Sequence, residues 1–234
     1  MRSERIRKAL TGEAPCSSCG VRDLVLFADL AEDDFDLIHL PIQELDLAPG
    51  DTLYHAEEEG GHLFTIRSGR VKLSQSLADG TQRIVRLLGP GATAGMEVLV
   101  GAPYEHTAVA LQQTLVCRIP REVVERLDRG TPHLHRQLMQ RWHDALRQAD
   151  RWLTGLSTGS ARERLARLIL SLLEAESDDL TLFGREDVGA MLGLTTETAS
   201  RTVAEFRRSG LLKDLGDNRY RAAREALEAI AGDG

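Results

Sequence analysis

The sequence predicts an α+β protein in which a β-rich half precedes a long helix and a compact, mostly helical region. Three observations predict this order. Turn residues recur at roughly ten-residue spacing between about Leu47 and Ile119, as in an all-β barrel or sandwich. Apolar residues take helical spacing after about Pro132. Two short amphipathic helices separated by a glycine follow between Arg185 and Phe206.

The composition is that of an ordinary globular protein. The chain has 234 residues, of which 42% are hydrophobic and 28% charged, so it can form a substantial core. No apolar run approaches the roughly 18 residues of a membrane helix, and the charged N-terminal stretch lacks a secretory signal. We therefore expect a cytoplasmic protein without membrane contact. The net charge of −7 argues against whole-surface attraction to nucleic acid, but it allows one local basic face.

The β-rich half is predicted from turns and from the short apolar segments between them. A short helix is expected first, at about Glu32 to Leu40, and Pro41 should end it. Asp79-Gly80 lies between two strand-like segments and predicts a hairpin. Residues 114–119 resemble a closing strand. The recurring turns are Gly50-Asp51, Gly60-Gly61, Ser68-Gly69, Asp79-Gly80 and Gly89-Pro90-Gly91.

The long helix carries an apolar stripe whose steps alternate between four and three residues. Such a stripe is typical of a coiled-coil seam and predicts a parallel homodimer. The alternative is a helix packed on its own domain, which would need a large intramolecular partner. The predicted dimerisation residues are Leu138, Trp142, Ala145, Ala149, Trp152 and Leu156.

A new helix should begin at Ser160, because Ser160 and Glu163 have the spacing of a capping box. Residues 174–179 form a polar linker. The next segment reads as two helices around a tight turn: Gly193 can take positive φ at the turn, and Gly189 allows close helix approach. Thr195 is a plausible N-cap of the second helix. The pattern is that of a helix-turn-helix, whose second helix enters the major groove of DNA.

The second helix has an outward face suited to reading bases. Glu197, Ser200 and Arg201 share one side, where a carboxylate can accept from cytosine N4 and a guanidinium can donate to guanine. The alternative is a solvated face with an incidental Glu197–Arg201 ion pair. Residues 196 to 224 include seven basic and four acidic side chains, a net charge of +3. Phosphate binding requires such a local positive charge. The predicted DNA-binding residues are Thr196, Glu197, Thr198, Ser200, Arg201, Arg207 and Arg208.

Residues 211–220 read as a small hairpin, the wing of a winged helix. Double-stranded DNA is therefore the expected partner. A dimer helix upstream would place two reading helices on one duplex, so we expect a palindromic site with half-sites one turn apart.

The succession of these parts resembles the Crp/Fnr superfamily of bacterial transcription regulators over nearly the whole chain. The resemblance is carried by residues 66–69, 89–91, 116–120 and 192–201. It implies a jelly-roll β-barrel like that of cyclic-nucleotide-binding proteins, and RNA polymerase as a partner of barrel loops such as Asp79-Gly80. The implied parts are a Cys-containing sensor segment, a β-barrel effector domain, a dimerisation helix and a winged helix-turn-helix, at residues 1–26, 27–131, 132–158 and 159–234. Glu197, Ser200 and Arg201 resemble the Fnr branch and imply a TTGAT…ATCAA operator.

The family's effector pocket lies in the barrel, and its cyclic-AMP-binding members carry a Gly-Glu pair for the ribose and an Arg-Ser pair for the phosphate. The matching positions here read Gly95-Met96 and His106-Thr107. A neutral histidine is a poor replacement for a charged guanidinium that binds phosphate with two hydrogen bonds. Cyclic AMP is therefore not expected.

The three cysteines suggest a different signal. They are too few for a disulfide scaffold, and the resemblance to Fnr-type oxygen sensors implies that Cys16, Cys19 and Cys117 are iron–sulfur cluster ligands. The family's remaining cysteine position is Val25, which cannot bind iron. Asp23 and Asp29 are nearby candidates for an oxygen ligand, although acidic residues in such a segment are usually just solvated. The alternatives are a thiol–disulfide or zinc switch, inert cysteines, or haem bound by His55, His62 or His106.

A redox enzyme using Cys16-x-x-Cys19 is the competing hypothesis from another class. Thioredoxin-like chemistry needs this motif after a strand and at the start of a helix, and nothing before Cys16 reads as a strand. No nucleophile elbow or phosphate-binding glycine loop is present. The sequence therefore predicts a regulator, not an enzyme.

Overall fold

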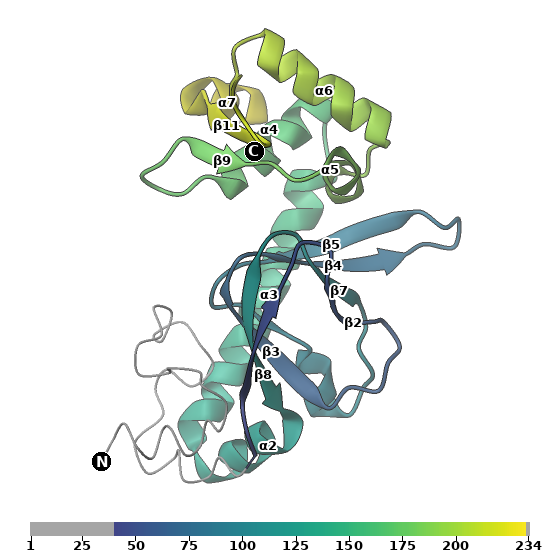
Figure 1. Ribbon diagram of the computed structural model, residues 1–234, viewed down its shortest axis with the longest axis vertical. Coiled ribbons are helices and arrows are strands. Elements are labelled where there is room, and N and C mark those ends of the chain that lie inside the picture. The colour runs from purple at the N-terminus through teal and green to yellow at the C-terminus, as the bar shows by residue number, and fades with distance from the viewer. Residues whose placement is uncertain (1–39, 233–234) are drawn as a thin grey trace. The chain divides into compact units, whose positions relative to one another are not determined.

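The computed structural model describes residues 40–232, which divide into two compact units (Figure 1). Residues 40–75 and 86–146 form the first unit, and residues 76–85 and 147–232 form the second. The expected helix at 32–40 and the positions Cys16, Cys19, Asp23, Val25 and Asp29 lie outside the described residues, apart from Leu40 at the edge. Each unit is described by itself below.

The β-rich half contains two four-stranded sheets, which confirms the predicted fold class. The described strands show no closed barrel, so the jelly roll takes the form of two sheets. Consecutive strands seldom pair, as a jelly roll requires: β8 pairs antiparallel with both β1 and β3. The first sheet has the order β1 (Gln43–Leu47), β8 (Thr114–Pro120), β3 (His62–Ser68), β6 (Thr93–Ala94). The second has the order β2 (Thr52–Tyr54), β7 (Thr107–Ala110), β4 (Val71–Ser76), β5 (Gln82–Leu88).

Two of the predicted turns are formed at glycines with positive φ, Gly69 and Gly80. Gly80 has a φ of 82° in the β4–β5 hairpin, and its N–H donates to the carbonyl of Leu77 at 2.9 Å. Gly69 has a φ of 84°, and a Cβ there would lie 2.5 Å from the Gln113 carbonyl oxygen. Only glycine fits this turn between β3 and β4. The core beneath is apolar, and Leu63, Ile66 and Val71 are fully buried.

Two helical segments and the first part of a third, up to residue 146, complete the first unit. The 3-10 helix η4 (Met96–Val100) follows β6, and α2 (Arg121–Gly130) follows β8 with Pro120 before its first residue. The long helix α3 (Pro132–Leu156) confirms the predicted helical stretch. Leu134 and Leu138 are buried, and the Arg141 guanidinium donates to the carbonyl of Gly91 at 2.5 Å. The start of α3 is thus anchored to the β-rich half.

The C-terminal region begins with α4 (Ala161–Leu172), and its predicted capping box is confirmed: the Ser160 hydroxyl accepts from the Glu163 N–H, and the Glu163 carboxylate accepts from the Ser160 N–H. The predicted wing is β10 (Leu212–Gly216) and β11 (Arg219–Ala222). A third strand, β9 (Asp179–Thr181), pairs with β11 at the end of the segment predicted to be a linker. The remaining helices are α5 (Arg185–Leu192), α6 (Thr196–Arg208) and α7 (Arg224–Ala231). None of the helices within 40–232 is long and apolar enough to cross a membrane.

Candidate nucleic-acid interface

The turn between α5 and α6 has the geometry that the two glycines predict. Gly193 ends α5 with a φ of 63°, and the Leu194 N–H donates to the Gly189 carbonyl at 2.9 Å. A Cβ on Gly189 would lie 2.7 Å from the Leu194 carbonyl oxygen, closer than real Cβ atoms approach. Both positions therefore require glycine, one for its backbone angle and one for space.

The start of α6 is fixed by Thr195, which confirms the predicted N-cap. Its hydroxyl oxygen accepts from the Thr198 N–H at 3.2 Å and lies 2.9 Å from the Thr198 hydroxyl. Thr198, which the sequence predicted to bind DNA, is half-buried. Its hydroxyl is within hydrogen-bond distance of the capping hydroxyl of Thr195. Ala199, Val203 and Phe206 are buried and form the inner face of the helix.

The outer face of α6 presents the predicted triplet. Glu197, Ser200 and Arg201 are exposed, as is Thr196 beside them. Within residues 40–232 none of the triplet side chains makes a hydrogen bond or ion pair, so the alternative Glu197–Arg201 ion pair is not formed. Their donors and acceptors remain available. Groups of this kind, near the N-terminal end of a reading helix, are those that contact base edges in the major groove.

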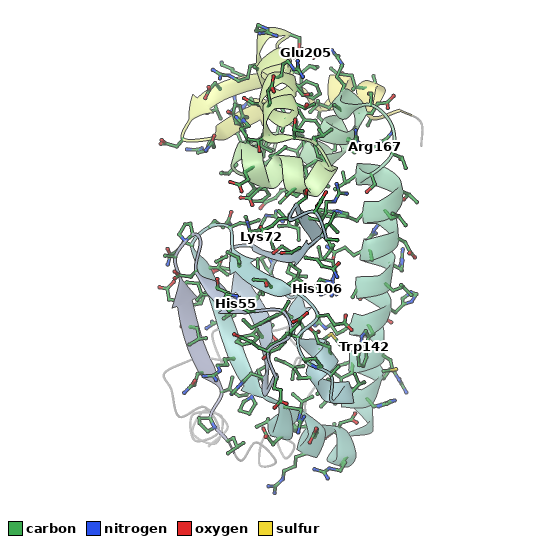
Figure 2. The ribbon with its side chains drawn as sticks, turned by 90° about the vertical axis from the view of Figure 1, so that its right-hand side faces the viewer. His55, Lys72, His106, Trp142, Arg167 and Glu205 are labelled. Carbon is green, nitrogen blue, oxygen red and sulfur yellow. The ribbon has the colours of Figure 1, made fainter. Side chains whose placement is uncertain are left out.

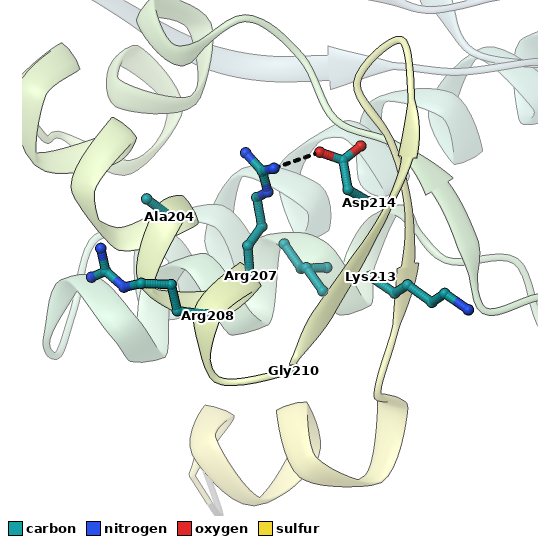
Figure 3. A pocket seen from close by; sticks show the side chains of 7 residues that line it. Ala204, Arg207, Arg208, Gly210, Lys213 and Asp214 are labelled. Atoms are coloured by element: carbon teal, nitrogen blue, oxygen red, sulfur yellow. Dashed lines mark ion pairs between the residues drawn. The ribbon is translucent and has the colours of Figure 1, made fainter.

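The C-terminal end of α6 faces the wing across an open groove of about 740 Å³. Arg207 and Asp214 form an ion pair of 2.8 Å across it. Figure 3 shows the Arg207 side chain reaching toward Asp214, whereas Arg208 and Lys213 point away from this pair. Neither Arg208 nor Lys213 has a partner among the described residues. These two cations lie on the helix and on the wing, and exposed cations of this kind are suited to contact phosphates of DNA.

Two arginines of α4 contact the two helices of the helix-turn-helix. Arg162 forms an ion pair with Glu205 of α6, and its guanidinium lies 5.7 Å from the centre of the Phe206 ring. Arg164 donates to the carbonyl of Leu192, the last residue of α5, at 2.6 Å. Local sequence patterns do not reveal these contacts, because they join residues 28 to 44 positions apart.

The predicted dimerisation stripe lies partly inward on α3. Leu138 and Leu156 are buried, Trp142, Ala145 and Trp152 are half-buried, and Ala149 is exposed. The large apolar side chains that α3 exposes most are its neighbours Met139, Leu146 and Leu153, at 46%, 61% and 66% exposure. These three are spaced seven residues apart, which is the heptad of a coiled coil.

The positions that the family motif assigns to a cyclic nucleotide hold other side chains. Met96 is buried, and the hydroxyl of Thr107 accepts from the Ala56 N–H at 3.1 Å. His106 is half-buried. Two charged residues that the sequence analysis passed over, Arg86 and Glu97, line a small cavity at this place.

Cys117 is the one predicted metal ligand among the described residues. It lies in β8, 9% exposed, opposite Glu44 on one side and Thr65 on the other. Glu44 forms an ion pair with Arg67. Within residues 40–232 no group of three His, Cys, Asp or Glu side chains could hold a metal. The described part therefore offers one thiol, and a site of several thiolates needs Cys16 and Cys19.

The histidines that could hold haem differ in their surroundings. His55 is exposed, and the His62 ring lies 3.2 Å from the Arg118 guanidinium. Burial lowers the pKa of His62, and the charge of Arg118 lowers it further, against Glu122.

Comparisons with known proteins agree on both halves of the chain. Residues 44–129 match the cyclic nucleotide-binding domain family, and residues 163–230 match the Crp-like helix-turn-helix domain family. The fumarate and nitrate reduction regulatory protein of Salmonella typhi is 30% identical over 226 residues, covering 93% of this chain and 90% of that protein. The transcriptional activator protein Anr of Pseudomonas aeruginosa is 28% identical over 239 residues, covering 98% of each.

Solved structures show the same fold. FixK2 from Bradyrhizobium japonicum is similar with a TM-score of 0.75 at 25% identity, covering 83% of this chain and 100% of that one. TTHB099, a transcriptional regulator of the CRP family from Thermus thermophilus, has a TM-score of 0.65 at 27% identity, covering 81% and 97%.

Proposed function

The chain belongs to the Crp/Fnr superfamily and is a DNA-binding transcription regulator of the FNR/ANR type, and we propose that as a homodimer it reads a TTGAT…ATCAA palindrome. The observation that carries this proposal is the exposed, unpaired triplet Glu197, Ser200 and Arg201 at the start of α6. As a regulator it is not an enzyme. It would act in the bacterial cytoplasm, where its DNA is.

The chemistry of the triplet suits this operator. Each half-site contains one G·C pair, whose guanine presents O6 and N7 as acceptors and whose cytosine presents the N4 donor. Arg201 can donate two of its N–H groups to O6 and N7 of the guanine, while Glu197 accepts from the cytosine. Ser200, between them on the same face, can donate to or accept from a neighbouring base. Arg208 and Lys213 would bind the flanking phosphates.

A palindrome requires two copies of the reading helix, and α3 offers the surface that would join them. Met139, Leu146 and Leu153 are exposed at heptad spacing, with Trp142 and Ala149 between them. A second copy of α3 lying parallel would bury this stripe. The seam of the proposed homodimer thus keeps Trp142 and Ala149 of the predicted stripe, and its other members lie one residue further along the chain.

The signal is proposed to be oxygen or redox state, sensed by thiolates of Cys16, Cys19 and Cys117. Bound to these residues, an iron–sulfur cluster would supply oxygen-sensitive redox chemistry. The whole chain has three cysteines, so one protomer cannot provide four thiolates. Either one iron would have a ligand other than cysteine, or the cluster would contain three irons. The buried Cys117 on β8 is shielded from solvent, as a cluster ligand should be. Contact of the Asp79-Gly80 loop with RNA polymerase is proposed by family analogy.

Two measurements test these proposals. Binding of the full chain to a duplex carrying TTGAT…ATCAA should exceed binding to the same duplex with both G·C pairs inverted by at least tenfold. Equal affinity for the two duplexes refutes the operator assignment. For the signal, protein purified without oxygen should contain iron and acid-labile sulfide. Iron-free protein after anaerobic reconstitution refutes the cluster; bound zinc or a reversible disulfide would then identify the switch.

A further inference from the structure

A small cavity lies between the strands β5 and β6, the helix η4 and the middle of α3. Its volume is about 110 Å³, and all of its walls belong to the first unit. Trp142 and Ala145 of α3 form one wall, and Leu73 and Met96 form part of the other. Figure 2 labels Trp142 on α3, and His106, which immediately precedes β7.

Two opposite charges line this cavity without pairing with each other. Arg86 of β5 makes no hydrogen bond or ion pair with any described residue. Glu97 of η4 accepts one hydrogen bond, from the Glu105 N–H at 3.2 Å, and forms no ion pair within residues 40–232. A guanidinium and a carboxylate that are partly withdrawn from water and unpaired carry a desolvation cost. A ligand that bridges them would offset it.

Further polar groups lie in or near the cavity. The Thr93 hydroxyl, which lines it, and Nδ1 of His106 are buried without a hydrogen bond among the described residues. His106 and Tyr54 do not line the cavity, but both interact with the charges of Arg86 and Glu97, and the Tyr54 hydroxyl interacts with the Gly95 backbone. Tyr54 is only 3% exposed. Burial raises its pKa, the Glu97 carboxylate raises it further, and Arg86 opposes both, which places the phenol near the two charges. Buried polar groups are normally satisfied, so the unpaired Thr93 hydroxyl and the unpaired charges of Arg86 and Glu97 favour a polar occupant.

The size of the cavity limits that occupant. Pockets for nucleotides and drug-sized ligands measure roughly 300 Å³ or more. At about 110 Å³ this cavity holds a molecule of a few heavy atoms, or three to four waters at roughly 30 Å³ each. A cyclic nucleotide does not fit it, and the motif positions Met96 and His106 offer neither a carboxylate nor a guanidinium.

We propose that this cavity binds a small zwitterionic amino acid, with its carboxylate on Arg86 and its ammonium group on Glu97. The Thr93 hydroxyl, which lines the cavity, donates a further hydrogen bond to the carboxylate. Trp142 and Ala145 close the cavity on the side-chain end and restrict it to residues such as glycine, alanine and serine. Because this wall is part of α3, a bound amino acid would contact the helix that forms the proposed dimer.

Isothermal titration calorimetry on the full chain tests the proposal with glycine, L-alanine and L-serine as probes. At least one should bind saturably, and acetate and methylammonium, which each carry one of the two charges, should bind at least tenfold more weakly. Arg86→Gln and Glu97→Gln should each reduce the affinity at least tenfold. The matched controls Arg126→Gln and Glu59→Gln, at exposed positions without partners, should bind as the parent chain does.

Three results would overturn the proposal. Absence of binding by all three amino acids means that the cavity holds water only. Acetate binding as tight as that of alanine, unchanged by Glu97→Gln, means a simple anion site. Tighter binding of cyclic AMP than of any amino acid contradicts the size limit. The variant Arg201→Ala should retain amino-acid binding, so the result stands apart from the outcome of the DNA experiments.

Discussion

The guanidinium of Arg207 and the carboxylate of Asp214 form an ion pair of 2.8 Å that joins the last turn of α6 to the first strand of the wing (Figure 3). Both side chains remain nearly half exposed, so the pair adds little to stability. Its effect is on charge: Asp214 neutralises one of the cations that the basic face presents to DNA.

Removing Asp214 should therefore strengthen binding to DNA of any sequence. Asp214→Asn frees Arg207 for phosphate, which predicts higher nonspecific affinity and a salt dependence steeper by about one phosphate contact. Arg207→Ala should have the opposite effect. Fluorescence anisotropy with a random duplex between 50 and 200 mM salt, roughly the range in which such slopes are read, measures both. The control Glu228→Gln removes a negative charge on α7, and a slope change as large as that of Asp214→Asn would refute the local explanation.

Loss of Arg201 should abolish discrimination between operator and inverted duplex. A bidentate arginine–guanine contact contributes about 1–3 kcal/mol, so Arg201→Ala should lower operator affinity roughly tenfold to a hundredfold and leave nonspecific binding nearly unchanged. The fold should be intact because the side chain is exposed and unpaired. Circular dichroism checks this. Unchanged specificity in Arg201→Ala would exclude it from base reading.

The exposed stripe on α3 predicts which substitution produces monomers. Leu146→Glu places a charge in the proposed seam and should shift the chain from dimer to monomer in sedimentation velocity, with loss of operator binding. Arg151→Glu changes charge on the same helix away from the stripe and should remain dimeric. If Leu146→Glu is dimeric and Ala145→Glu is not, the originally predicted stripe is the seam instead.

Gly189 should tolerate no side chain. Alanine favours a helix by up to about 1 kcal/mol over glycine, but its Cβ would lie 2.7 Å from the Leu194 carbonyl oxygen. Gly189→Ala should therefore lower the free energy of unfolding by about 1–3 kcal/mol and reduce DNA binding. Gly155→Ala in α3, where a Cβ meets nothing within 4 Å, should be neutral or stabilising in the same urea titration. Equal effects of the two substitutions would contradict this reading of the turn.

His106 should make stability fall in mild acid. Burial lowers its pKa from the ordinary 6.5, and Arg86 lowers it further against Glu97 and Glu105. The imidazole of His106 therefore binds a proton more readily in the unfolded chain than in the folded chain. Its contribution to the free energy of unfolding is full above about pH 6.5 and is lost as the pH falls toward the lowered pKa. Urea midpoints at pH 7.5 and 5.5 should differ less for His106→Gln than for the parent chain. His55→Gln, at an exposed position, serves as control and should keep the parent's difference.

The sequence by itself determined the order of the parts and the local geometry of the reading head. The Ser160 cap, the Thr195 cap and the Gly193 turn are confirmed because each depends on hydrogen bonds or backbone angles within about four residues. The outward placement of Glu197 and Arg201 follows from helical spacing in the same way.

Tertiary structure alone decided what depends on distant residues. The strand β9, the Arg207–Asp214 pair and the two sheets result from pairings between segments far apart in the chain, which local patterns do not specify. The apolar stripe of α3 also could not be assigned from local patterns. Residues 138, 145 and 152 have the same seven-residue spacing as residues 139, 146 and 153. Which of the two faces outward is decided by the strands and helices that pack against α3, because burial of one face leaves the other exposed.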